Sequence, residues 1–163
     1  MGTGKRINDA PVCFGAKNDG YGSFNVTKSG QLKTMKLLHR SGQIKCNSHT
    51  AVSYWGCTHQ RYADKKLMTF ITNDKRETMF PPGHGLEAFR KGDPHIICLD
   101  IKHFYTLEGA NHTSPELVFP DPSSPVSVSR DQELQIWYGQ DWKGCGEKDN
   151  SGEVCVDVYA WYL

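Results

Sequence analysis

Six cysteines, at positions 13, 46, 57, 98, 145 and 155, constrain this 163-residue chain more than any other feature. Their number is even and none lies in a CxxC pair, the close spacing that zinc sites usually have. Two Asn-x-Thr sequons accompany them, at Asn25 and Asn111. Together these features predict disulfides, an oxidising compartment and therefore a secreted glycoprotein. Many pairings are open to six cysteines, and the simplest joins sequence neighbours: Cys46 with Cys57, Cys145 with Cys155, and then Cys13 with Cys98.

Length and charge set further limits. A chain of this length favours one domain. The formal net charge of +1 creates no strong field for nucleic acid or an anionic membrane. No apolar run approaches the ~20 residues needed to cross a bilayer. The start of the chain is basic but lacks the apolar stretch of a signal peptide. We therefore expect residues 1–12 to be an added start or a leader remnant, and residues 13–163 to form the domain.

The chain is interrupted often, by sixteen glycines and eight prolines, and short β-branched and aromatic runs lie between them. These runs predict strands at 23–27, 31–38, 43–46, 51–55, 67–72, 95–107, 117–119, 126–129, 133–138 and 154–163. Segment 31–39 also fits one face of a helix. Short strands in this number predict an all-β fold with at most one short helix. The expected architecture is a single antiparallel β-sandwich or jelly roll, stabilised by disulfides.

The last predicted strand contains one charged residue. Val154, Val156 and Val158 fall on one face by the two-residue period, and Asp157 falls on the other face, between Cys155 and the aromatic residues that follow. Both faces are largely apolar, so we expect either a central strand covered on both sides or a sheet whose outer face meets a partner. A carboxylate buried there must be hydrogen-bonded, paired or metal-bound, because burying it alone costs several kcal/mol.

Acidic and amide side chains are concentrated in segment 141–157, which also contains glycines. Calcium prefers such oxygen ligands, roughly six to eight of them. The spacing does not match an EF-hand, because Val158 stands where the bidentate glutamate belongs. The hypothesis is an irregular calcium loop with ligands Asp141, Glu147, Asp149 and Asp157. The alternative is a solvated polar hairpin with its turn at 150–152, in which Asp157 is paired inside the sheet.

Catalytic signatures are absent from the sequence. It contains no HExxH, no GxSxG and no Cys/His signature, and its cysteines are better explained by disulfides than as nucleophiles. We therefore predict a binding protein without catalytic residues. For ligand contact the candidates are Trp142 and Tyr138, with flat apolar rings, and His84 in the proline-containing loop 80–85. The alternative is that these rings fill the core.

Several motifs resemble one domain of secreted proteins of corals and sea anemones. They include Ser53-Tyr-Trp-Gly-Cys57, Glu133-Leu-Gln-Ile-Trp-Tyr-Gly-Gln-Asp141 and Asp149-Asn-Ser-Gly-Glu-Val-Cys-Val-Asp-Val-Tyr-Ala160. Some of those proteins belong to the skeletal organic matrix. The resemblance extends from about Cys13 to Leu163, and it implies an extracellular module without known enzymatic activity. The family pattern has Glu-Asp after Trp-Tyr-Gly, whereas this chain has Gln140-Asp141, which weakens a carboxylate pair there.

Two functional hypotheses follow, from different classes. The first is a secreted, lectin-like module that binds carbohydrate, with a calcium site in segment 141–157. The second is a structural component of an extracellular matrix without a small ligand, and an uncharacterised hydrolase ranks third. The expected partners are extracellular glycans or matrix proteins, with self-association as a further hypothesis. Nucleic-acid binding and membrane insertion are not expected.

Overall fold

The computed structural model describes residues 4–59, 62, 66–81, 85–88, 102–122, 124–145 and 147–163. Every strand pairing among them is antiparallel. The larger sheet contains β1 (Lys5–Arg6), β2 (Val12–Gly15), β4 (Gly30–Lys45), β9 (Glu116–Val118), β10 (Val126–Val128) and β12 (Ser151–Tyr162). The second sheet has the order β3 (Gly22–Asn25), β11 (Glu133–Tyr138), β6 (Thr69–Asn73), β7 (Thr78–Phe80). A small third sheet joins β5 (Lys66–Leu67) to β8 (Tyr105–Thr106), and the helix α1 (Gly139–Lys143) follows β11.

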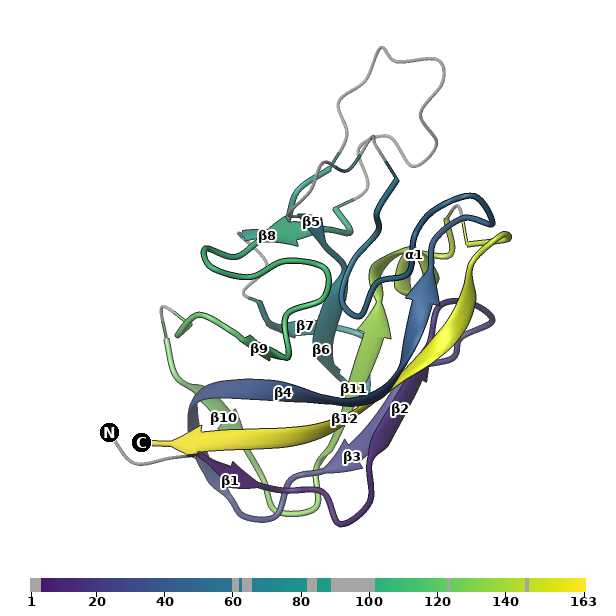
Figure 1. Ribbon diagram of the computed structural model, residues 1–163. Coiled ribbons are helices and arrows are strands. Elements are labelled where there is room, and N and C mark those ends of the chain that lie inside the picture. The colour runs from purple at the N-terminus through teal and green to yellow at the C-terminus, as the bar shows by residue number, and fades with distance from the viewer. Residues whose placement is uncertain are drawn as a thin grey trace.

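The long strands β4 and β12 lie side by side along the larger sheet and curve strongly (Figure 1). Their register shifts where Cys155 faces Ser41 and Val156 faces His39, which leaves one residue of β4 without a partner. Such a bulge bends the strand that contains it. Gly42 lies beside the bulge with φ +81°, and a Cβ there would be 2.0 Å from the Glu153 carbonyl oxygen. Only glycine fits that backbone approach.

The core is formed by inward-facing residues of the two larger sheets. β12 contributes Val154, Val156 and Val158, the face that the two-residue period predicted. The opposing strand β11 contributes Leu134 and Ile136, both fully buried. In β3 buried and exposed residues alternate, whereas five consecutive residues of β11 are buried. The apolar side chains between the two sheets form the core that holds the sheets together.

The prediction of an all-β, antiparallel, single-domain fold with disulfides is confirmed. Within the described residues the single α-helix has five residues. The ambiguous segment 31–39 is a strand, part of β4, and 133–138 matches β11. Segment 51–55 is not a strand: it contributes an isolated bridge, Ser53 to Ile44. Of segment 95–107, residues 102–107 are described and contain β8, and the rest lies outside the described residues.

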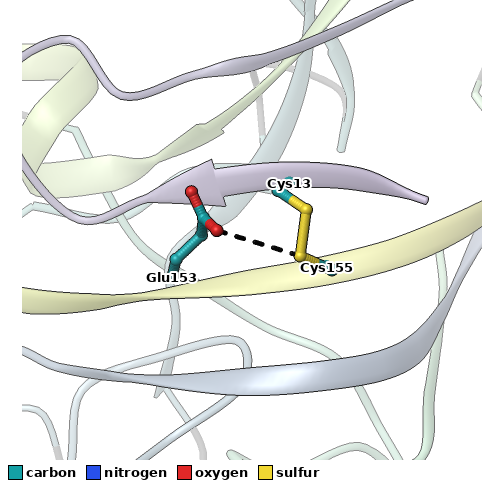
Figure 2. Close-up of side chains that lie close together, drawn as sticks. All are labelled: Cys13, Glu153 and Cys155. Atoms are coloured by element: carbon teal, nitrogen blue, oxygen red, sulfur yellow. Dashed lines mark hydrogen bonds between the residues drawn. A yellow bond between two sulfur atoms is a disulfide. The ribbon is translucent and has the colours of Figure 1, made fainter. Parts of the chain in front are cut away.

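The disulfides confirm one of the three predicted pairs and overturn the other two. Cys46 bonds Cys57, as expected. Cys13 bonds Cys155 instead of Cys98, because β2 pairs with β12 and places these two cysteines directly opposite each other (Figure 2). The predicted pair of Cys145 with Cys155 is therefore wrong. Cys145 is disulfide-bonded, and Cys98 lies outside the described residues.

The segment before Cys13 is part of the fold, although the domain was expected to begin at Cys13. Its strand β1 pairs with β12, and the Ile7 amide donates a hydrogen bond to the Val158 carbonyl oxygen at 2.9 Å. The side chain of Asn8 is also buried. The ordered domain therefore begins before Cys13, since these residues cover one edge of β12.

Candidate functional site

The helix α1 fixes the position of Asp141 inside the molecule. The helix begins directly after β11 and ends at Gly144, which has the left-handed conformation typical of helix ends. The Asp141 side chain is 1% exposed. Its two carboxylate oxygens accept hydrogen bonds from the backbone amides of Asp19 and Gly20, each at 2.8 Å. The turn between β2 and β3 is thereby tied to α1 by a buried carboxylate.

Glu147 lies beside Asp141. Burial, a hydrogen bond between the two side chains and the negative charge of Asp141 raise the pKa of Glu147 from 4.5 to about 7. A hydrogen bond from the Asn18 backbone acts in the opposite direction. Glu147 therefore keeps its proton at higher pH than an ordinary carboxyl group, because burial and the adjacent negative charge both disfavour its ionised form. The buried Oε2 atom of Glu147 has no hydrogen-bond partner among the described residues.

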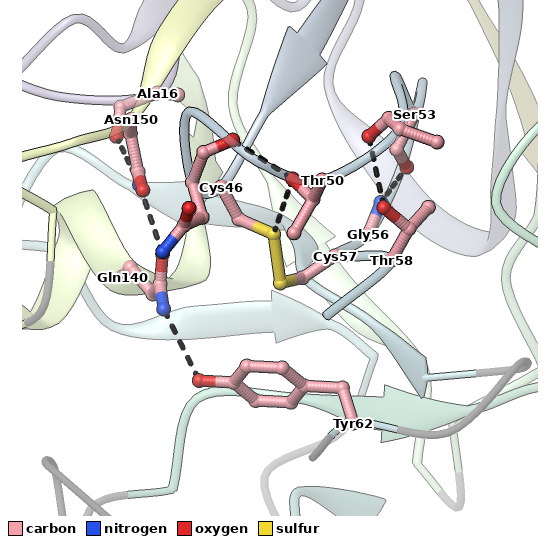
Figure 3. The surroundings of a disulfide bond; sticks show 12 residues. Ala16, Cys46, Thr50, Ser53, Gly56, Cys57, Thr58, Tyr62, Gln140 and Asn150 are labelled. Atoms are coloured by element: carbon pink, nitrogen blue, oxygen red, sulfur yellow. Dashed lines mark hydrogen bonds between the residues drawn. A yellow bond between two sulfur atoms is a disulfide. The ribbon is translucent and has the colours of Figure 1, made fainter. Parts of the chain in front are cut away.

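Asn150 is held in the same turn as Glu147, and its backbone amide donates to the Glu147 carbonyl oxygen at 2.9 Å. The fully buried side chain of Asn150 donates through Nδ2 to the Ala16 carbonyl oxygen and to Oε1 of Gln140, both at 2.9 Å (Figure 3). Both donor hydrogens are thus used. The remaining atom, Oδ1, is buried and has no hydrogen-bond partner in the described part of the chain.

A chain of buried polar groups supports this arrangement from the interior. Gln140 donates through Nε2 to the Tyr62 hydroxyl at 3.1 Å, as Figure 3 shows. The Tyr62 hydroxyl in turn lies 2.9 Å from Nε2 of the buried His103. These contacts fix the Gln140 amide, and Gln140 fixes the Asn150 amide. The direction of Asn150 Oδ1 is therefore set by the fold.

Asp141, Glu147 and Asn150 together form what we call the acidic site. It combines a buried carboxylate, a carboxyl group with a raised pKa, and two buried acceptor oxygens for which the described residues supply no donor. Buried polar atoms are rarely left unpaired in proteins, because each costs roughly 1–3 kcal/mol. Carboxylate and amide oxygens are the ligands of hard cations such as calcium. This donor set fits calcium.

The other two predicted calcium ligands lie elsewhere. Asp149 is exposed and accepts a 3.4 Å hydrogen bond from Asn47 Nδ2. Asp157 accepts a 2.9 Å hydrogen bond from Asn8 Nδ2, and its other oxygen lies 3.5 Å from Arg40 Nε. Asp157 therefore has the partners that the alternative interpretation expected of a paired acid, and its role as a calcium ligand stays a prediction. The sequence suggested one loop, but β12 carries Asp157 along the sheet to the side of β1.

One set of three close ligand-type groups exists among the described residues, formed by Cys13, Glu153 and Cys155. Figure 2 shows the Glu153 carboxylate beside the bridged sulfurs, 4.0 Å from Cys155 Sγ. A disulfide sulfur has no proton to donate and is not a thiolate ligand. This cluster is therefore not a metal site.

The structure buries two of the three predicted ligand-contact residues. The Tyr138 ring is fully buried, and its hydroxyl donates to the Gly56 carbonyl oxygen at 2.7 Å. Trp142 is 8% exposed and donates through Nε1 to the Arg76 carbonyl oxygen at 3.1 Å. Both rings belong to the core, as the alternative interpretation expected, and neither presents a face for a ligand. His84 lies outside the described residues.

Tyr21 has an aromatic ring that faces solvent. Its side chain is 41% exposed and stacks on Trp137 with ring centroids 4.7 Å apart, and the Arg76 guanidinium lies 4.5 Å from the centre of the Trp137 ring. Tyr21 directly follows Gly20, whose amide is bound by Asp141. The sequence contained a signal for it, because Tyr21 stands between two glycines and a bulky ring in a turn is a recognition residue.

No known family model matches the chain, and no curated protein matches it significantly. Among solved structures it is similar to AJLec from the sea anemone Anthopleura japonica, with 37% sequence identity and a TM-score of 0.86. The similarity covers 100% of this chain and 99% of AJLec. AJLec is a lectin, a binding protein without enzymatic activity, which agrees with the prediction of a binding module. The chain therefore belongs to the family of the sea anemone lectin AJLec.

Proposed function

We propose that the protein is a secreted lectin that binds carbohydrate at the acidic site with the help of a calcium ion. The observation that carries the function is the similarity to AJLec at 37% identity, which extends over all of this chain and 99% of AJLec. The turn of residues 17–20 and the helix α1 lie at one end of the molecule. We place the carbohydrate site at this end because the exposed ring of Tyr21 directly follows that turn.

Calcium binding is supported by the donors of the acidic site. Glu147 Oε2 and Asn150 Oδ1 receive no hydrogen bond from any residue that the structure describes, and each Asp141 oxygen uses one of its lone pairs for a backbone amide. These three side chains supply fewer oxygens than the roughly six to eight that calcium prefers. Asp141, Glu147 and Asn150 would hold the ion, which would leave coordination positions open to neighbouring sugar hydroxyls. Glu147 would have to give up its proton to act as a ligand.

Sugar recognition also uses apolar surface, because the C–H groups of a pyranose ring form a flat apolar face. Tyr21 offers a partly exposed ring next to the acidic site, and Trp137 supports that ring from behind. Aromatic rings with one polar tip are common at such surfaces. We therefore assign Tyr21 as the stacking residue, in place of Trp142 and Tyr138.

Secretion is supported by the disulfides, which persist in oxidising compartments. No helix among the described residues is long and apolar enough to cross a membrane. The partners that fit these features are extracellular glycans. Matrix proteins, self-association and glycosylation of the chain stay predictions.

The test is a glycan array in which the full chain is measured in calcium and again in chelator. Glu147→Gln should abolish binding in calcium because it removes a negative charge from the acidic site. Asn150→Ala should abolish it because it removes an acceptor oxygen. Asp149→Asn is the matched control. It removes one negative charge from the same turn but contacts Asn47 outside the acidic site, so binding should stay unchanged.

Three results would contradict the proposal. Glycan binding that survives chelation would exclude the calcium ion, and equal loss in Asp149→Asn would exclude the acidic site. Binding to no glycan on the array, together with binding to extracellular matrix proteins, would favour the structural matrix component.

A further inference from the structure

A groove of about 520 Å³ lies on the molecule between the segment that joins β1 to β2, the strand β3 and the turn between β10 and β11. Its polar lining consists mainly of Asn8, Asp9, Asn25, Thr27, Arg130 and Asp131. None of these residues belongs to the acidic site. Two of them, Asn25 and Thr27, are the acceptor and the hydroxyl residue of one sequon. The groove and the sequon therefore occupy the same surface.

Strand geometry exposes this sequon. Phe24 and Val26 point into the core, so Asn25 and Thr27, two residues apart, share the outward face. The Asn25 side chain donates through Nδ2 to the Asp131 carbonyl oxygen at 2.8 Å. A secondary amide formed at Nδ2 keeps one hydrogen, so this hydrogen bond is compatible with modification.

The backbone beside the sequon is held firmly. The Val26 amide donates to the Gln132 carbonyl oxygen at 2.9 Å, and the Asp131 amide donates to the Val26 carbonyl oxygen at 2.8 Å. A group attached to Asn25 would therefore leave the surface at a fixed point on the wall of the groove. A fixed point of attachment lowers the entropy cost of seating that group in the groove.

We propose that Asn25 carries an N-linked glycan whose first sugar residues occupy this groove. In the transfer, Nδ2 forms a bond to C1 of the first N-acetylglucosamine of a lipid pyrophosphate-linked oligosaccharide. The bond from C1 to the pyrophosphate oxygen breaks, the amide loses one proton, and lipid pyrophosphate leaves. The lining combines carboxylates, amides and a guanidinium with the apolar side chains of Ile7 and Val12, a mixture that suits the hydroxyl, acetamido and C–H groups of an amino sugar.

The second sequon provides an internal control. Asn111 lies in an exposed loop, where its Oδ1 accepts a hydrogen bond from the Thr113 amide at 3.0 Å. Local contacts in this Asx turn fix the direction of the Asn111 amide. Asn111 does not line the groove beside Asn25. A glycan on Asn111 should therefore project into solvent and not occupy the groove.

The proposal rests on secretion and does not depend on the acidic site. The full chain is produced through the secretory pathway of a eukaryotic cell, and its glycopeptides are measured before and after peptide N-glycosidase, which leaves aspartate at each occupied asparagine. Thr27→Val should remove the glycan from Asn25, and Thr27→Ser, which keeps the sequon, should retain it. The melting temperature should fall by about 2–4 °C when the Asn25 glycan is removed.

Trimming by an endoglycosidase that leaves one N-acetylglucosamine should preserve most of that gain in melting temperature, since the first residue occupies the groove. Removing the Asn111 sequon by Asn111→Gln should leave the gain unchanged. Unmodified Asn25 in the secreted protein would overturn the proposal. So would a glycan on Asn25 whose complete removal leaves the melting temperature unchanged. Either result is independent of glycan-array binding, which tests the lectin function separately.

Discussion

The buried acid Asp157 allows a quantitative test of how the larger sheet is stabilised. Its carboxylate accepts a hydrogen bond from Asn8 Nδ2 at 2.9 Å and lies 3.5 Å from Arg40 Nε. Asn8 also accepts a hydrogen bond from the Val158 amide at 2.8 Å and donates to Ala10. The acid therefore joins the segment after β1 to the middle of β12.

Asp157→Ala should destabilise the protein by about 2–4 kcal/mol. A hydrogen bond to a charged group contributes roughly 1.5–3 kcal/mol, and its loss leaves a buried Asn8 donor unpaired. Arg40 adds at most about 1 kcal/mol, because its side chain is 55% exposed and the pair is screened by solvent. For a chain of this length the melting temperature should fall by about 5–10 °C.

Asp157→Asn is the matched comparison, since it keeps the acceptor oxygen and the volume and removes the charge. It should cost about 1 kcal/mol. The free energy of unfolding is measured by chemical denaturation, in calcium and in chelator. Equal values for the two variants would refute the hydrogen bond to Asn8 as the main contribution. A cost of Asp157→Ala that disappears in chelator would restore Asp157 as a calcium ligand and refute its structural role.

The remaining predictions concern the acidic site, the stacking ring and the disulfides. Because the pKa of Glu147 is raised to about 7, folded calcium-free protein retains a proton that the unfolded chain releases near pH 4.5. The stability of the calcium-free protein should therefore fall as pH rises between these values. The gain in melting temperature with calcium should be larger at about pH 8 than at about pH 5.5. Glu147→Gln should remove this difference between the two pH values. Tyr21→Ala should weaken glycan binding about three- to tenfold in titration calorimetry while Tyr21→Phe keeps it, and equal affinities would exclude stacking. Replacing Cys46 and Cys57 by serine should cost about 3 kcal/mol in denaturant unfolding. Loss of the bond between Cys13 and Cys155, which are 142 residues apart, should cost more, and the reverse order would contradict the chain-entropy argument.

Local sequence was sufficient for most of the strands. In β12 the valines at 154, 156 and 158 repeat with the two-residue period, and their burial follows from strand geometry alone. The pairing of Cys46 with Cys57 could also be predicted, because closing a short loop costs little chain entropy. The same local pattern identified Asp157 as a buried acid that requires a partner, without indicating which partner.

Contacts between distant segments required the tertiary structure. Cys13 bonds Cys155 because β2 pairs with β12, and no spacing in the sequence contains that register. Asp157 is paired by Asn8, 149 residues away. Asp141 and Glu147 were identified from their segment, but Asn150 became a candidate ligand only when the fold used both of its donor hydrogens and left Oδ1 buried. Sequence patterns indicate which side chains are buried, whereas the partners of buried polar groups depend on how the strands are ordered in space.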